Sequence, residues 1–145
     1  MTPFGAKLRQ MRAARDIKLK DMAKALDVTP AYLSALEHGQ RGQPSRYFVR
    51  RVCSFFNIIW DDAEELHRLA AISHPRVTVD TAGLDEKRTE LANLLARDIG
   101  KLTDEQVEQL FVAARSVDYQ AVADEATQLI ESLSAEAVAD PRVRS

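Results

Sequence analysis

The chain of 145 residues is long enough for one hydrophobic core and an appendage, and its 46% hydrophobic and 29% charged residues are typical of globular proteins. No apolar run approaches the ~20 residues that a membrane span needs, and no signal-peptide core follows Met1. The single cysteine, Cys53, excludes an internal disulfide. We therefore expect a cytoplasmic protein that does not enter membranes.

Charge is distributed unevenly along the chain. Residues 1–60 contain 11 Lys and Arg against 4 Asp and Glu, a net charge of +7. Residues 61–145 contain 9 against 18, a net charge of −9. The basic half is suited to contact with phosphates, whereas duplex DNA would repel the acidic half. A chance segregation of surface charge is the alternative.

The first predicted helix begins after Thr2, which is a good N-cap, and runs to about Arg15. The next segment, Lys18–Glu37, is the most informative of the chain, because it predicts two short helices joined by a tight turn. Thr29 is the expected N-cap of the second helix, and Pro30 stands at its first position, where no N–H is needed. The apolar positions of the two helices are Met22, Ala23, Leu26, Leu33 and Leu36. This pattern predicts a helix-turn-helix, with an ordinary helical hairpin as the alternative.

Gly39 suits the left-handed residue that closes a helix, and a polar loop, Gly39–Pro44, follows the predicted helix-turn-helix. Ser45 is the expected N-cap of a helix over 46–56, and Asp61 that of a fifth helix, with Glu64 at the capping-box position. Five short helices predict a compact all-α domain over residues 1–74.

The pattern changes after this domain. Residues 75–80 alternate apolar and polar side chains, so we expect residues 75–83 to form either an extended linker or a strand that pairs with a second subunit. Helices with apolar stripes are predicted over Leu84–Ile99, Thr103–Val117 and Tyr119–Val138, the second opened by a capping box from Thr103 to Gln106. We expect residues 84–145 to be an acidic helical region that dimerises or binds a protein partner.

Twelve residues in and around the first three predicted helices form a pattern that is typical of one family of proteins: Leu8, Arg12, Met22, Ala23, Leu26, Val28, Thr29, Tyr32, Leu33, Ser34, Glu37 and Gly39. In these residues the segment 4–58 resembles the phage-repressor or Cro-like helix-turn-helix family, also called the XRE family of bacterial regulators. The resemblance implies a repressor-like five-helix fold that binds double-stranded DNA. It also implies a structural ion pair between Glu37, which ends the recognition helix, and Arg12 of the first helix.

The resemblance places the base-reading positions of the family on Thr29, Pro30, Ala31, Tyr32, Ser34 and Ala35. None of these is Gln, Asn, Arg or Lys, so bidentate pairing with a purine is not available from them. Methyl and hydroxyl contacts and the shape of the DNA remain. Further groove contacts are expected from the following loop through Gln40, Arg41 and Gln43. The expected phosphate contacts are Lys18, Lys20 and Arg46, and His38 is expected to contact a phosphate or a groove.

Taken together, these features predict a dimeric transcriptional repressor, bacterial or from a phage and associated with the nucleoid, that binds a palindromic operator. One alternative is an antitoxin that regulates its own operon and binds a toxin through its C-terminal region. Another is an interaction module in which the helix-turn-helix is only a scaffold. We expect no enzymatic activity and no cofactor. No metal site is expected either, because Cys53, His67 and His74 lack ligand spacing.

Overall fold

The computed structural model describes residues 1–139, except for the side chains of residues 118–122, 125 and 133–139. Residues 140–145 of the predicted acidic region therefore lie outside the described residues. The chain divides into two compact units, Met1–Val79 and Asp80–Ser145, and each is described by itself. The division lies within the predicted linker at 75–83, while the roles of the two units stay predictions.

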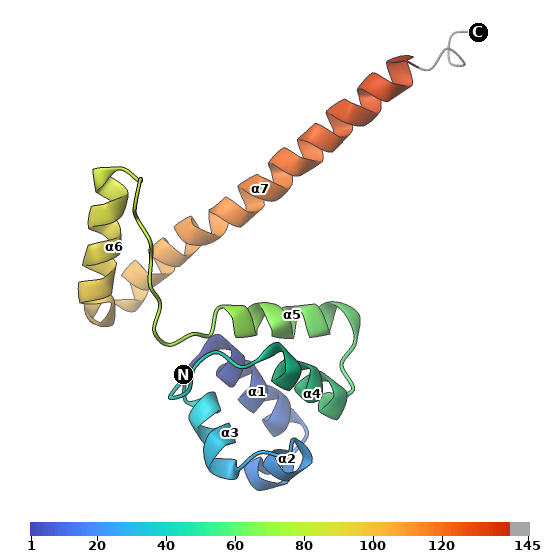
Figure 1. Cartoon of the computed structure of the whole chain (residues 1–145), viewed down its shortest axis with the longest axis vertical. Coiled ribbons are helices and arrows are strands. Elements are labelled where there is room, and N and C mark those ends of the chain that lie inside the picture. The colour runs from blue at the N-terminus through green and yellow to red at the C-terminus, as the bar shows by residue number, and fades with distance from the viewer. Residues whose placement is uncertain (140–145) are drawn as a thin grey trace. The chain divides into compact units, whose positions relative to one another are not determined.

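The N-terminal unit is built from helices alone, as the sequence predicts (Figure 1). Its elements are α1 (Pro3–Ala14), α2 (Leu19–Ala25), α3 (Pro30–Glu37), α4 (Arg46–Phe56) and α5 (Trp60–Ala71). Helix α3 packs against both α1 and α2, and α5 packs against α1 and α4. This arrangement places the two helices of the predicted motif next to each other.

Side-chain caps set most of the helix boundaries. The hydroxyl oxygens of Thr2 and Ser45 each accept a hydrogen bond from a backbone N–H in the first turn of their helices, at 3.1 Å in both cases, so these predicted caps are confirmed. The predicted Asp61 cap is wrong. Helix α5 begins at Trp60, two residues before the start that an Asp61 cap implies. It follows the extended Ile59 and has no side-chain cap. Asp61 lies in its first turn, where a carboxylate is stabilised by the helix dipole.

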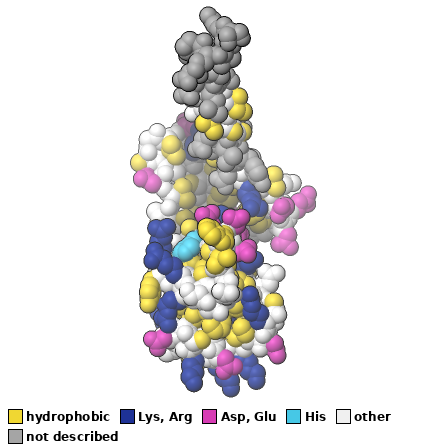
Figure 2. All heavy atoms as spheres, turned by 90° about the vertical axis from the view of Figure 1, so that its right-hand side faces the viewer, with side chains coloured by type: hydrophobic (Ala, Val, Ile, Leu, Met, Phe, Trp, Pro, Cys, Tyr) yellow, Lys and Arg dark blue, Asp and Glu magenta, His cyan; other side chains and the backbone are white. Residues whose placement is uncertain are grey.

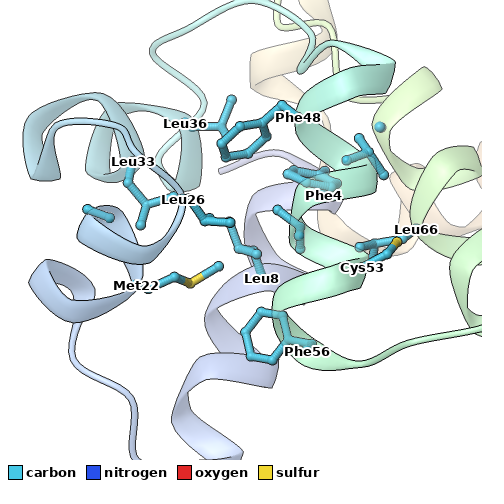
Figure 3. Packing of buried hydrophobic residues seen from close by; sticks show 14 residues of the cluster. Phe4, Leu8, Met22, Leu26, Leu33, Leu36, Phe48, Cys53, Phe56 and Leu66 are labelled. Atoms are coloured by element: carbon cyan, nitrogen blue, oxygen red, sulfur yellow. The ribbon is translucent and has the colours of Figure 1, made fainter.

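One hydrophobic core joins all five helices (Figure 3). The buried residues are Phe4, Leu8, Met22, Ala23, Leu26, Leu33, Leu36, Phe48, Val49, Val52, Cys53, Phe56, Leu66 and Ala70. Burying each large side chain of this kind contributes about 1.5–3 kcal/mol relative to leaving it exposed. The core therefore fixes α2 and α3 on a rigid base.

A buried serine connects the start of the first helix to the end of the fifth. The hydroxyl oxygen of Ser73 accepts a hydrogen bond from the backbone N–H of Phe4 at 2.8 Å. The same hydroxyl donates to the carbonyl oxygen of Leu69 at 2.6 Å. Without this contact, the Phe4 N–H and the Ser73 hydroxyl would be buried with fewer partners. The contact therefore stabilises the packing of the end of α5 against the start of α1.

Helices α1 and α3 are in close backbone contact at a glycine, Gly5. A Cβ atom at Gly5 would lie 2.4 Å from the carbonyl oxygen of Glu37, which no relaxed structure allows. We expect Gly5→Ala to lower the free energy of unfolding by about 1–3 kcal/mol, because the two backbones must separate. A urea titration measures the change. The matched control is Gly42→Ala, where a Cβ meets nothing within 4 Å. Equal midpoints for the two variants would show that the contact is not tight in solution.

The C-terminal unit contains α6 (Glu86–Asp98), the short 3-10 helix η1 (Ile99–Lys101) and α7 (Asp104–Ala139). The capping box at the start of α7 is confirmed, since Thr103 N–H donates to the Gln106 side chain at 2.9 Å and Gln106 N–H donates to Thr103 Oγ1 at 3.2 Å. The prediction of two helices over 103–138 is wrong. The segment forms one long helix, α7 (Figure 1). The helix continues through the predicted break at Asp118 because no glycine or proline stands there.

Apolar side chains of the C-terminal unit remain at the surface. From Asp80 onward, none of the described side chains is buried. Leu110 is 37% and Phe111 51% exposed on α7. The segment before α6 has no strand among the described residues, and Val77 and Val79 are exposed, so the intersubunit strand stays a prediction. In the part of the chain that the structure describes, no helix has both the length and the hydrophobicity of a membrane span.

Candidate nucleic-acid interface

The turn between α2 and α3 has a fixed conformation. Asp27 adopts a left-handed φ of 50°, and the N–H of Val28 donates to the carbonyl oxygen of Ala23 at 3.0 Å. Ala23 is fully buried, and Val28 packs against the core from the turn. The small alanine side chain lets the two helices approach closely. The angle between α2 and α3 is therefore set by the core.

Helix α3 has one buried face and one free face. Thr29 Oγ1 accepts a hydrogen bond from the N–H of Tyr32 at 3.1 Å, and Pro30 begins the helix, as predicted. Leu33 and Leu36 are buried in the core. Among the predicted base-reading positions, Thr29, Pro30 and Ala31 are exposed, and Tyr32, Ser34 and Ala35 are half-buried. The first turn of α3 is thus the part most open to a partner.

Tyr32 links α3 to the next helix and to the loop between them. Its ring packs edge to face against the ring of Phe48 on α4, with 5.9 Å between ring centroids. The guanidinium carbon of Arg41 lies 5.7 Å from the centroid of the same ring. The ring of Tyr32 therefore contacts both α4 and the loop, in addition to any contact that its hydroxyl makes with DNA.

The loop after α3 is anchored at its start. His38 ends the helix, and its Nδ1 lies 2.8 Å from the carbonyl oxygen of Ser34. Gly39 has the left-handed φ of 72° that the sequence predicts for a helix end, and the N–H of Gln40 donates to the carbonyl oxygen of Ala35 at 2.8 Å. His38 and the three predicted loop residues, Gln40, Arg41 and Gln43, are exposed.

The predicted phosphate contacts lie at two helix starts. Lys18 immediately precedes α2, Lys20 lies in its first turn, and Arg46 is the first residue of α4; all three are exposed. Figure 2 shows Lys and Arg side chains at several positions on one face of the N-terminal unit. Leu19, between the two lysines, packs against the core and is no candidate for a polar contact.

A buried carboxylate holds the recognition helix against α1. Glu37 is only 2% exposed, and Arg12 approaches it with two nitrogens, Nε at 3.1 Å from Oε1 and Nη2 at 3.2 Å from Oε2. Arg12 also donates to the carbonyl oxygen of Ile17 at 3.1 Å, just before α2. Arg9, which was not predicted, lies 3.8 Å from Oε2 of Glu37. The ion pair thus joins α3 to α1, and Arg12 connects both to the residues just before α2.

Among the described residues, reactive and metal-binding side chains do not form a catalytic or metal site. Cys53 is buried in the core, and burial raises the pKa of its thiol, so it is a poor nucleophile at neutral pH. Within the described part of the chain, no three His, Cys, Asp or Glu side chains come together as metal ligands.

The fold and the exposed face of α3 define a helix-turn-helix domain, and the comparison with known proteins agrees. Residues 3–73 match the family described as "Helix-turn-helix domain", so this segment of the chain belongs to that family. Over 62 residues the chain is 27% identical to a Bacillus subtilis (strain 168) protein named "Uncharacterized HTH-type transcriptional regulator RghRB". This similarity covers 43% of the chain and 45% of the relative, so the chain spans about half of that protein's length. No solved structure matches the chain.

Proposed function

We propose that this protein is a sequence-specific DNA-binding transcriptional regulator, in the simplest case a repressor that acts on the bacterial or phage nucleoid in the cytoplasm. The observation that carries the proposal is helix α3, which is capped by Thr29, rigidly packed on one face and open on the other. A helix presented in this way fits the major groove of DNA. The name of the B. subtilis relative supports the same function.

We further propose that the regulator is a homodimer on a palindromic operator. A single helix-turn-helix contacts only one half-site, and a dimer places two recognition helices ~34–36 Å apart, one turn of DNA. Helix α7 has an exposed apolar stripe, formed by Val107, Leu110, Phe111 and Val117. This stripe supports the assembly, because burying it against another chain is favourable.

The same stripe supports a second candidate, an antitoxin. In that case, the acidic C-terminal region binds a toxin, and the helix-turn-helix regulates the operon of the pair. Pull-down of a small protein encoded by a neighbouring gene, together with monomeric behaviour of the free regulator, would favour this candidate. Neither candidate has a catalytic activity, a cofactor or a resident metal.

DNA binding by this unit should depend steeply on salt, because Lys and Arg side chains release counterions from phosphates. We expect Lys20→Ala to weaken binding to every sequence and to reduce the slope of log affinity against log salt by about one per bound subunit, which is about two for the proposed homodimer. Fluorescence anisotropy with a labelled duplex at several salt concentrations measures this slope.

The matched control is Lys24→Ala, in the last turn of the same helix. It removes the same charge away from the start of α2 and should leave the slope almost unchanged. Binding that is absent, or that does not change with salt, would contradict the proposed function and favour the scaffold alternative.

A further inference from the structure

The exposed surface of α3 lacks a bidentate hydrogen-bonding side chain, and a residue of the following loop can supply one. The exposed positions of α3 offer no side chain that can make two hydrogen bonds to one base. If the protein is a sequence-specific regulator, as proposed above, a donor from outside α3 is needed beside this helix. The residues after α3 are the nearest in sequence.

Arg41 is the one cation of this loop, and the structure holds it beside the recognition helix. Its guanidinium group lies over the Tyr32 ring, at 5.7 Å from the centroid. Tyr32 belongs to the first turn of α3 and is supported from behind by Phe48, which is buried in the core. No hydrogen bond or ion pair joins Arg41 to another described residue. Its charge is thus positioned by an aromatic face and remains available.

The loop itself is fixed at both ends. The Gly39 turn and the bond from Gln40 N–H to Ala35 anchor its start. Pro44 is buried, and Ser45 caps α4. A short loop between two such anchors leaves Arg41 little freedom to move away from Tyr32. The ordering entropy of this side chain is therefore partly lost before DNA binds.

We propose that Arg41 reads a guanine in the major groove beside the first turn of α3, and that Tyr32 positions it. The contact with the ring uses none of the N–H groups of Arg41 in a hydrogen bond, so these donors stay free. These N–H groups match the O6 and N7 acceptors of guanine in a bidentate pair. Residues at the start of a recognition helix are the ones that reach base edges, and Arg41 lies beside them.

Three other arginines of the N-terminal unit with aromatic or acidic partners show the difference in position. Arg12 and Arg9 are directed to Glu37 inside the unit. Arg51 lies over the Tyr47 ring at 5.8 Å, but both belong to α4. Arg51 is therefore a matched control: the same residue type on the same kind of ring, away from α3.

The test is selection from randomised duplexes with the full-length protein, followed by sequencing of the bound DNA. Wild type should select a guanine at one position of each half-site. Arg41→Ala and Arg41→Lys should each reduce the preference at that position alone by roughly 5-fold to 150-fold. Tyr32→Phe, which keeps the ring, should retain the preference, and Tyr32→Leu should weaken it. Arg51→Ala should select the wild-type motif.

Two results overturn the inference while leaving the proposed function intact. One is an Arg41→Ala variant that selects the wild-type motif. The other is a uniform loss of affinity with an unchanged motif, which would make Arg41 a phosphate contact. If wild type itself selects no sequence, sequence-specific regulation fails as well, and this is visible before any variant is compared.

Discussion

Glu37→Ala should lower the free energy of unfolding of the N-terminal unit by about 3–5 kcal/mol, since it removes one partner of a buried ion pair. Glu37 is 2% exposed and bonded by two nitrogens of Arg12. Without the carboxylate, the guanidinium group of Arg12 stays largely buried and keeps only the carbonyl oxygen of Ile17. Since α1, α3 and the approach to α2 all meet here, the recognition helix should also lose its fixed position.

Native-state hydrogen exchange of the core amides of α3 and α4 measures this change for the N-terminal unit alone. Glu37→Gln keeps the shape of the side chain and separates loss of charge from loss of packing. The control is Glu64→Ala, an exposed acidic residue of α5, which should change stability by less than about 0.5 kcal/mol. A Glu37→Ala variant as stable as this control would show that the ion pair does not hold the unit together.

Charging the apolar stripe of α7 should separate the proposed dimer. Leu110 and Phe111 are exposed in the single chain, so replacing both by Asp should cost the isolated helix little. In a dimer interface, the same charges would be buried without partners. We expect the variant to sediment as a monomer and to lose about 10²- to 10⁴-fold in operator affinity, because the second recognition helix no longer binds at high effective concentration.

Sedimentation velocity and anisotropy measure the two effects on the same samples. Ser116→Asp provides the control, since Ser116 is exposed on α7 but lies on the side of the helix away from Leu110. It should leave both assembly and affinity unchanged. A Leu110→Asp, Phe111→Asp variant that stays dimeric would place the dimer contact elsewhere, and a monomeric wild type would favour the antitoxin.

Local signals predicted most of the N-terminal fold. The caps at Thr2, Thr29 and Ser45 and the left-handed Gly39 depend on residues within one turn of each other, so the sequence alone predicts them. The cap of α5 was misplaced because Asp61 suits both a cap and a first turn, and only the extended Ile59 before it decides between them. The division of α7 was wrong because a break was expected where no helix-breaking residue stands.

Contacts between distant segments were beyond sequence reasoning. Gly5 contacts the backbone of Glu37, and Ser73 accepts a hydrogen bond from the N–H of Phe4. Both contacts form only when the helices pack together. The contact of Arg41 with the Tyr32 ring likewise depends on the path of the loop after α3. Arg9 could have been predicted, since it stands one turn before Arg12 on α1 and so shares its face.

Capture of fragmented genomic DNA by the purified full-length protein, at two salt concentrations, is the most direct test of sequence-specific regulation. We predict recovery of one inverted-repeat motif near promoters, retained at the higher salt because base contacts add to phosphate contacts. Diffuse recovery that disappears at the higher salt would contradict this function, since only phosphates would then be bound.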